Sequence, residues 1–85
     1  MSETKSLVMF GADWCGDCRR TKKQLNELQI PYEWIDTVEV DGAADEARAI
    51  SGRTNIPVVV YPDGTHHVEP SNQDVEAKLR ELGML

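Results

Sequence analysis

Two cysteines three positions apart, Cys15 and Cys18, are the only sulfhydryl groups in this chain of 85 residues. Such a pair can bind a metal, close a structural disulfide or carry out thiol–disulfide exchange. A disulfide closing so short a loop restrains the unfolded chain little, and so stabilises it little. A zinc site needs two further ligands, and the only histidines, His66 and His67, are neighbours that point to opposite faces of a strand. We therefore expect exchange chemistry and no metal ligands.

The start of a helix decides how the two thiols differ. A short apolar segment ends at Gly11, and from Cys18 onward apolar residues recur at helical spacing. Cys15 then lies at the helix N-terminus, where free N–H groups and the positive end of the helix dipole favour a thiolate. Cys18 lies one turn further, on the buried face. We expect Cys15 to attack a substrate disulfide and Cys18 to resolve the resulting mixed disulfide.

Charged and aromatic neighbours surround the pair. Four of the nine basic residues follow it closely: Arg19, Arg20, Lys22 and Lys23. Their positive charges either stabilise the Cys15 thiolate or simply form a solvated helix face. The negative charge of Asp17 either destabilises that thiolate or serves to cap the helix. The direction of the Cys15 pKa shift stays open. Trp14 offers a wall beside the sulfur or is a partly buried packing residue, and Gly16 lets a partner's backbone approach.

Composition narrows the class of partner. The net charge of −6 lacks the basic footprint that nucleic-acid binding requires. The longest apolar run, Ile56 to Tyr61, is far below the roughly 20 residues that span a bilayer. Residues Met1 to Lys5 lack the basic start and long apolar stretch of a secretory signal. We expect a cytoplasmic protein that binds neither nucleic acid nor membrane.

The pattern of elements predicts an α/β fold in the order β-α-β-α-β-β-α, one domain over residues 1–85. The expected strands are 5–10, 32–36, 58–61 and 65–68. The first expected helix runs from Cys18 and ends before Pro31. The second runs from an N-cap at Asp41 to Gly52, and the third from a capping box at Ser71 to Gly83. The first three strands favour parallel crossovers, and Asp63-Gly64 predicts a tight hairpin between the last two. The result is a mixed four-stranded sheet flanked by three helices.

The chain resembles the thioredoxin superfamily in the order of its motifs. A strand is followed by Trp14–Cys18 and a long helix, and Ile56-Pro57 later opens another strand. The compact form, without an extra N-terminal strand and helix, is similar to glutaredoxins. The similarity to mycoredoxins, the glutaredoxin-like proteins of actinobacteria, is greater still. The shared features are Arg53-Thr54 just before Pro57, the Asp63-Gly64 turn, and Pro70-Ser71 ahead of a helix with Val75, Ala77, Lys78 and Leu79.

This resemblance implies a cis Ile56-Pro57 bond, with Pro57 beside the Cys15 sulfur and the Ile56 backbone free to pair with an extended substrate. It also implies a groove for a small thiol, which would be formed by Trp14, Cys15, Asn55, Ile56, Pro57, Ser71 and Asn72, with Gly16 and Asp17 beside them. The helix N-terminus at Ser71 would suit a carboxylate. Two departures stand out. Gly16-Asp17 replaces the Pro-Tyr of glutaredoxins, and Glu69-Pro70 replaces their double glycine.

The function implied is reduction of mixed disulfides between proteins and a small thiol, which would be mycothiol rather than glutathione. No cofactor is expected to be tightly bound, and the protein is expected to act as a monomer on disulfide-containing or S-thiolated proteins. One alternative is a dithiol electron donor of the thioredoxin or NrdH-redoxin kind, reduced by a flavoprotein reductase. Another is an iron–sulfur cluster carrier that bridges two subunits through Cys15 of each.

Overall fold

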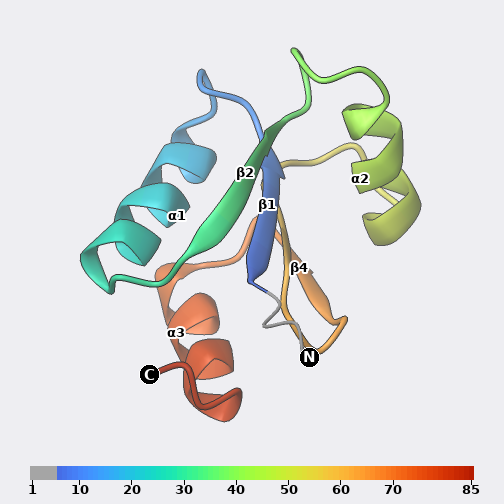
Figure 1. Cartoon of the computed structure of the whole chain (residues 1–85). Helices are drawn as coiled ribbons and strands as arrows, with labels where there is room; N and C mark the ends of the chain where they lie inside the picture. The colour runs from blue at the N-terminus through green and yellow to red at the C-terminus, as the bar shows by residue number, and fades with distance from the viewer. Residues whose placement is uncertain (1–5) are drawn as a thin grey trace, which may run out of the picture.

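Four strands form one mixed sheet in the order β2-β1-β3-β4, with helices on both faces (Figure 1). The computed structural model describes residues 6–85, so the strand start expected at Lys5 lies outside the described residues. The strands are β1 (Leu7–Gly11), β2 (Tyr32–Asp36), β3 (Val58–Val60) and β4 (His66–Val68). The helices are α1 (Gly16–Glu27), α2 (Ala43–Ser51) and α3 (Asn72–Glu81). The predicted element order and mixed sheet are confirmed.

The direction of β3 differs from the prediction. β1 and β2 are parallel, as expected, but β3 runs antiparallel to β1, and β4 antiparallel to β3. Gly11 pairs with Asp36 and Phe10 with Val58, so β3 starts at the end of the sheet where β2 finishes. The nine-residue α2 and segment 52–57 bring the chain back to that same end. A parallel crossover would have required the chain to return to the opposite end.

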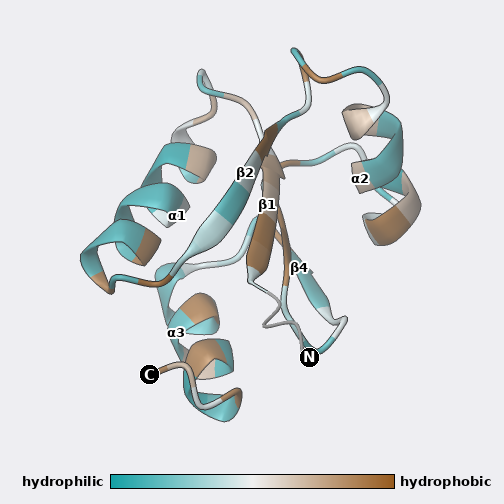
Figure 2. Cartoon of the chain, in the orientation of Figure 1, coloured by the Kyte–Doolittle hydropathy of each residue, from teal (hydrophilic) through white to brown (hydrophobic). Residues whose placement is uncertain are grey.

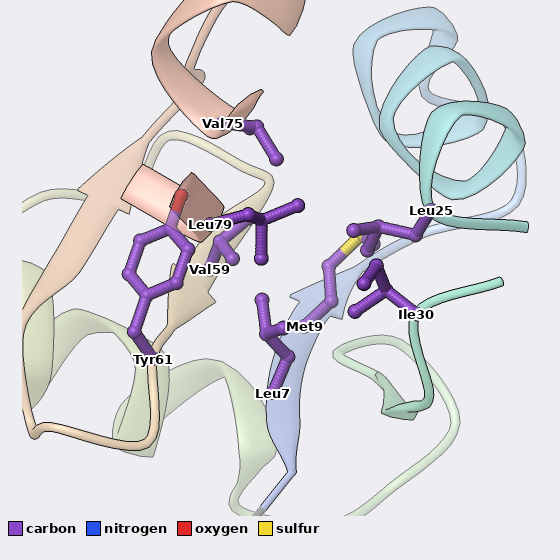
Figure 3. Close-up of a cluster of buried hydrophobic side chains, with 8 residues drawn as sticks. All are labelled: Leu7, Met9, Leu25, Ile30, Val59, Tyr61, Val75 and Leu79. Atoms are coloured by element: carbon purple, nitrogen blue, oxygen red, sulfur yellow. The ribbon is translucent and has the colours of Figure 1, made fainter. Parts of the chain in front are cut away.

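β1 holds the core together because both of its faces are buried. Leu7 and Met9 face α1 and α3 in a cluster of eight side chains (Figure 3): Leu7, Met9, Leu25, Ile30, Val59, Tyr61, Val75 and Leu79. Phe10 faces the other way and packs with Val58 against α2. Figure 2 shows this as apolar colour on β1, with helices that are apolar only in part. In residues 6–85, no helix combines the length and apolar character needed to cross a membrane.

The ends of the helices confirm two of the predicted signals and correct a third. Ser71 caps α3 as a capping box, accepting from the Asp74 N–H at 3.0 Å. Gly52 ends α2 in the left-handed conformation at φ +74°. Asp41 is not the N-cap of α2. The Ala43 N–H bonds the Val40 carbonyl in a turn, so the helix begins after Gly42, whose φ of +80° only glycine adopts readily.

The β3–β4 hairpin turns at the predicted place, through the three residues between the expected strands. The Tyr61 N–H bonds the Thr65 carbonyl at 2.8 Å, which leaves three loop residues, and Gly64 takes φ +88°. On β4, His66 is exposed, whereas His67 packs against Tyr61, with 2.8 Å between its Nδ1 and the Tyr61 Oη. The two histidines therefore point apart, as expected. Among residues 6–85, no group of three or more His, Cys, Asp or Glu side chains is placed to hold a metal ion.

Candidate active site

Cys15 is the N-cap residue of α1. The loop that leaves β1 is closed by a hydrogen bond from the Cys15 N–H to the Ala12 carbonyl at 3.1 Å. The Cys15 Sγ accepts the Cys18 N–H at 3.3 Å, which is the bond that a serine or aspartate oxygen makes at an ordinary N-cap. The sulfur is partly exposed. It therefore lies at the positive end of the α1 dipole.

Cys18 is fully buried, one turn into α1. Burial first, and then the hydrogen bond with Cys15, raise the pKa of the Cys18 thiol to about 12. A hydrogen bond from the Ala12 backbone acts in the opposite direction. Cys18 is consequently protonated and inaccessible while Cys15 is reduced. Both thiols are free in this structure, and they differ in burial: Cys15 is partly exposed and Cys18 is buried.

The space for the Cys18 sulfur is provided by Gly11 at the end of β1. A Cβ built on Gly11 would lie 2.5 Å from the Cys18 Sγ and 2.9 Å from the ring of Trp34 on β2. The Lys22 Nζ lies 3.9 Å from the centroid of that ring and 3.7 Å from the Asp13 carboxylate. We predicted Gly11 only as the end of a strand. Its contacts with Cys18 on α1 and Trp34 on β2 connect three elements of the fold. No local pattern in the sequence indicates these contacts.

The basic run after Cys18 is partly neutralised. Arg20 pairs with Asp17 at 2.9 Å, and Lys22 lies 3.7 Å from Asp13. Arg19 donates to the Asp13 carbonyl at 3.3 Å. The positive field expected around Cys15 is therefore weakened by two carboxylates, and the charge of Asp17 is itself satisfied by Arg20.

Segment 54–57 lies beside the Cys15 sulfur. The Ile56-Pro57 bond is cis, as the resemblance implied, and Pro57 is fully buried. The Ile56 carbonyl oxygen lies 3.9 Å from the Cys15 Sγ. Asn55 is exposed and donates through its Nδ2 to the Glu69 Oε1 at 3.0 Å. Of the predicted residues of this segment, Ile56 is therefore in contact with the Cys15 sulfur, Asn55 contacts Glu69, and Pro57 is buried.

An open groove of about 490 Å³ runs past the Cys15 sulfur. It is lined by Trp14, Cys15, Gly16, Asp17, Thr54, Asn55, Ile56 and Glu69. Trp14 is 72% exposed, so it is a wall of the groove and not a packing residue. Thr54 and Glu69 are additions to the predicted set. The replacement of a double glycine by Glu69-Pro70 was the signal that could have identified Glu69.

Ser71 and Asn72 do not line this groove. They line an adjoining hollow of about 480 Å³ together with Asp17, Arg20 and Glu69. Asp17 and Glu69 belong to both spaces and so lie at their junction. The Ser71 N–H already faces the Asp74 carboxylate at 3.4 Å. The carboxylate at the N-terminus of α3 is therefore that of Asp74. The sequence had predicted that a carboxylate of the bound ligand would lie there.

Comparison with known proteins decides the family. The family model for glutaredoxins matches residues 7–67, which include both cysteines and the cis-proline. The chain belongs to the glutaredoxin family. A glutaredoxin of Mycobacterium tuberculosis is 32% identical over 77 residues, which cover 89% of this chain and 92% of that protein. Mycoredoxin 1 of Corynebacterium glutamicum is 31% identical over 78 residues, covering 91% and 96%.

The fold comparison agrees with the sequence comparison. The crystal structure of a glutaredoxin from Archaeoglobus fulgidus superposes with a TM-score of 0.79 at 25% identity, covering 88% of this chain and 86% of that one. The present chain, as a member of the glutaredoxin family, is accordingly a thiol–disulfide oxidoreductase that acts on disulfides with thiol reductants. The cysteine pair at the start of α1 is the part of the structure suited to that chemistry.

Replacing Gly11 with alanine is expected to lower the free energy of unfolding by about 1–3 kcal/mol, because the new methyl group overlaps both Cys18 and Trp34. Urea unfolding of the reduced protein measures this loss. Gly16→Ala is the matched control, since no atom lies within 4 Å of a Cβ at Gly16. Equal stability of the two variants would contradict the close contact described here.

The pKa of Cys18 can be measured in a Cys15→Ser variant. Burial, the largest cause of the raised Cys18 pKa, is kept in this variant, whereas the contributions of the Cys15 thiol are removed. The pKa therefore stays above the ordinary value of 9.0, so folding favours the protonated thiol, and this stabilisation is lost as the pH rises above 9. We expect the alkylation rate of Cys18 in the folded variant to keep rising with pH beyond pH 9. The same thiol in urea should level near pH 9. A plateau near pH 9 in the folded protein would contradict the assigned environment.

Proposed function

We propose that this glutaredoxin reduces mixed disulfides between proteins and a small thiol, with Cys15 attacking and Cys18 resolving. The observation that carries the proposal is the difference between the two thiols: Cys15 faces an open groove at a helix N-terminus, and Cys18 is buried beneath it. The cytoplasm is the proposed compartment, because its reducing poise keeps such a pair in the thiol form.

The first step exchanges one disulfide for another. The Cys15 thiolate attacks the sulfur of the small thiol, the sulfur–sulfur bond to the protein breaks, and the protein thiolate leaves and takes up a proton. Cys15 then carries the small thiol in a mixed disulfide. A groove of about 490 Å³ beside Cys15 gives that adduct room, and the exposed Trp14 forms one of its walls.

The second step is prepared by the first. Two of the influences that raise the Cys18 pKa come from Cys15, namely a side-chain hydrogen bond and its charge, and both end when Cys15 becomes part of a disulfide. The bond from the Ala12 backbone, which lowers the pKa, remains. Cys18 then loses its proton more readily and attacks the Cys15 sulfur. The small thiolate leaves, and two electrons from a reductant later reopen the Cys15–Cys18 disulfide. A second molecule of the small thiol can instead release the first directly.

The Ile56 backbone supports binding of an extended ligand beside Cys15. Its carbonyl lies 3.9 Å from the Cys15 Sγ, and within residues 6–85 its N–H has no hydrogen-bond acceptor. A peptide bond of the substrate can therefore pair with Ile56 as a strand pairs with a sheet edge. This pairing places a cysteine of the ligand against Cys15.

Mycothiol is the proposed small thiol, with glutathione the less favoured one. The support is the similarity to mycoredoxin 1 over nearly the whole chain. Glu69 stands where glutaredoxins commonly have glycine, and the α3 N-terminus already faces the Asp74 carboxylate. Both features reduce what this site offers to the carboxylates of glutathione.

A second candidate is a dithiol donor reduced by a flavoprotein reductase. It is favoured by the direct contact between the two thiols, which makes a Cys15–Cys18 disulfide a ready intermediate. In that reaction Cys15 attacks a disulfide within the target protein, and Cys18 is needed in every turnover.

Steady-state reduction of a small mixed disulfide separates these two functions. Coupled to mycothiol, the Cys18→Ser variant should keep activity within about tenfold of the unmodified protein, whereas Cys15→Ser should lose about a thousandfold or more. Glutathione and a thioredoxin reductase are the parallel couplings. Turnover only with the flavoprotein, and only with both cysteines, would replace the proposed function by the second candidate.

A further inference from the structure

Glu69 holds a carboxylate in a fixed place at the junction of the two hollows. Its N–H donates to the Pro57 carbonyl at 2.9 Å, and its φ of +50° turns the chain away from β4. Its Oε1 accepts the Asn55 Nδ2 at 3.0 Å. Both backbone and side chain are thus tied to the segment that carries the cis-proline. Glu69 lines both the Cys15 groove and the α3 hollow.

The charge of Glu69 is not balanced by a cation. Asp17, the other carboxylate at this junction, pairs with Arg20 at 2.9 Å, and Arg20 also donates to the Pro70 carbonyl at 2.9 Å. Within residues 6–85 Glu69 forms no ion pair, and its side-chain partner is a neutral amide. None of the residues that line the Cys15 groove is basic. The groove therefore has a negative potential at its Glu69 end.

Basic residues do lie in an adjoining hollow. Arg48 and Arg53 line a neighbouring hollow of about 230 Å³ that shares Trp14, Thr54, Asn55 and Ile56 with the Cys15 groove. Arg48 is paired with Asp45 at 3.3 Å. Neither arginine lines the Cys15 groove, and neither forms an ion pair with Glu69 within residues 6–85.

We propose that Glu69 is a specificity-determining residue that selects reactants at Cys15 by charge. Neutral or cationic small thiols and disulfides enter the groove, and anionic ones are disfavoured by the fixed carboxylate. Naming a neutral thiol as the cosubstrate rests on the proposed function, whereas the effect of charge on reactions at Cys15 does not. Unit charges at groove distances near a protein surface change rates about two- to fivefold.

Alkylation of Cys15 with two reagents of similar size tests the charge effect without turnover. A Cys18→Ser background leaves Cys15 as the single thiol, and rates are measured with neutral iodoacetamide and anionic iodoacetate at low salt. Both reagents meet the same thiolate, so the ratio of their rates cancels any change in the Cys15 pKa. Glu69→Gln should lower the iodoacetamide-to-iodoacetate ratio about two- to fivefold, and 1 M salt should remove most of this difference.

Glu27→Gln is the matched control. It makes the same change of charge at the far end of α1, roughly 18 Å from Cys15 at 1.5 Å per residue. Glu69→Gln keeps an oxygen that accepts from Asn55, and equal melting temperatures confirm that the fold is kept. An unchanged ratio in Glu69→Gln, or an equal change in Glu27→Gln, would overturn the proposal.

Turnover then tests the choice of cosubstrate. Glu69→Gln should raise kcat/KM for glutathione disulfide, which is anionic, about two- to fivefold relative to hydroxyethyl disulfide, which is neutral. A shifted alkylation ratio without turnover of any disulfide would leave the role of Glu69 standing and contradict the proposed function. Turnover with neither ratio shifted would leave the function standing and overturn the role of Glu69.

Discussion

The hydrogen bond from the Cys18 N–H to the Cys15 sulfur is the interaction on which the site depends. It makes a thiol serve as a helix cap, so the start of α1 and the reacting group are the same residue. That position requires the chain to leave the sheet centre and enter a helix within a few residues. The Cys15-to-Ala12 backbone bond closes this turn, and β1, buried on both faces, anchors it.

The same geometry separates two chemically identical side chains. One helical turn takes the chain from a partly exposed sulfur to a fully buried one, and burial keeps the second thiol protonated. Gly11 makes this possible because the absence of its side chain leaves room for both the Cys18 sulfur and the Trp34 ring. Glutaredoxin chemistry in this chain therefore depends on a residue of β1 that takes no part in the reaction.

Features decided by neighbouring residues were predictable from the sequence. The cysteine pair at a helix start and the Ser71 capping box depend on residues within one turn, and the resemblance to glutaredoxins supplied the cis Ile56-Pro57 bond. The direction of β3 was not predictable, because it depends on where segment 52–57 brings the chain back to the sheet. The start of α2 was assigned to Asp41 because acidic caps are common, but the turn through Gly42 delays it.

Contacts between distant segments were the other part that the sequence did not show. Gly11 meets Cys18 and Trp34 from three different elements, and Glu69 reaches the Cys15 groove through Asn55 and Pro57. Asp17 and Glu69 lie where the Cys15 groove meets the α3 hollow, and Ser71 lines only the hollow, away from the reacting sulfur. Family resemblance places such residues near the site, and only the packed structure shows which of them face it.

The most direct test of the mechanism is to capture its intermediate. The reduced Cys18→Ser variant is mixed with a protein S-thiolated by mycothiol, quenched in acid, and analysed by non-reducing peptide mass spectrometry. We predict the mycothiol moiety on the peptide that carries Cys15, together with a free thiol on the target protein. A target protein joined directly to Cys15, or no adduct on Cys15 at all, would contradict the proposed order of attack.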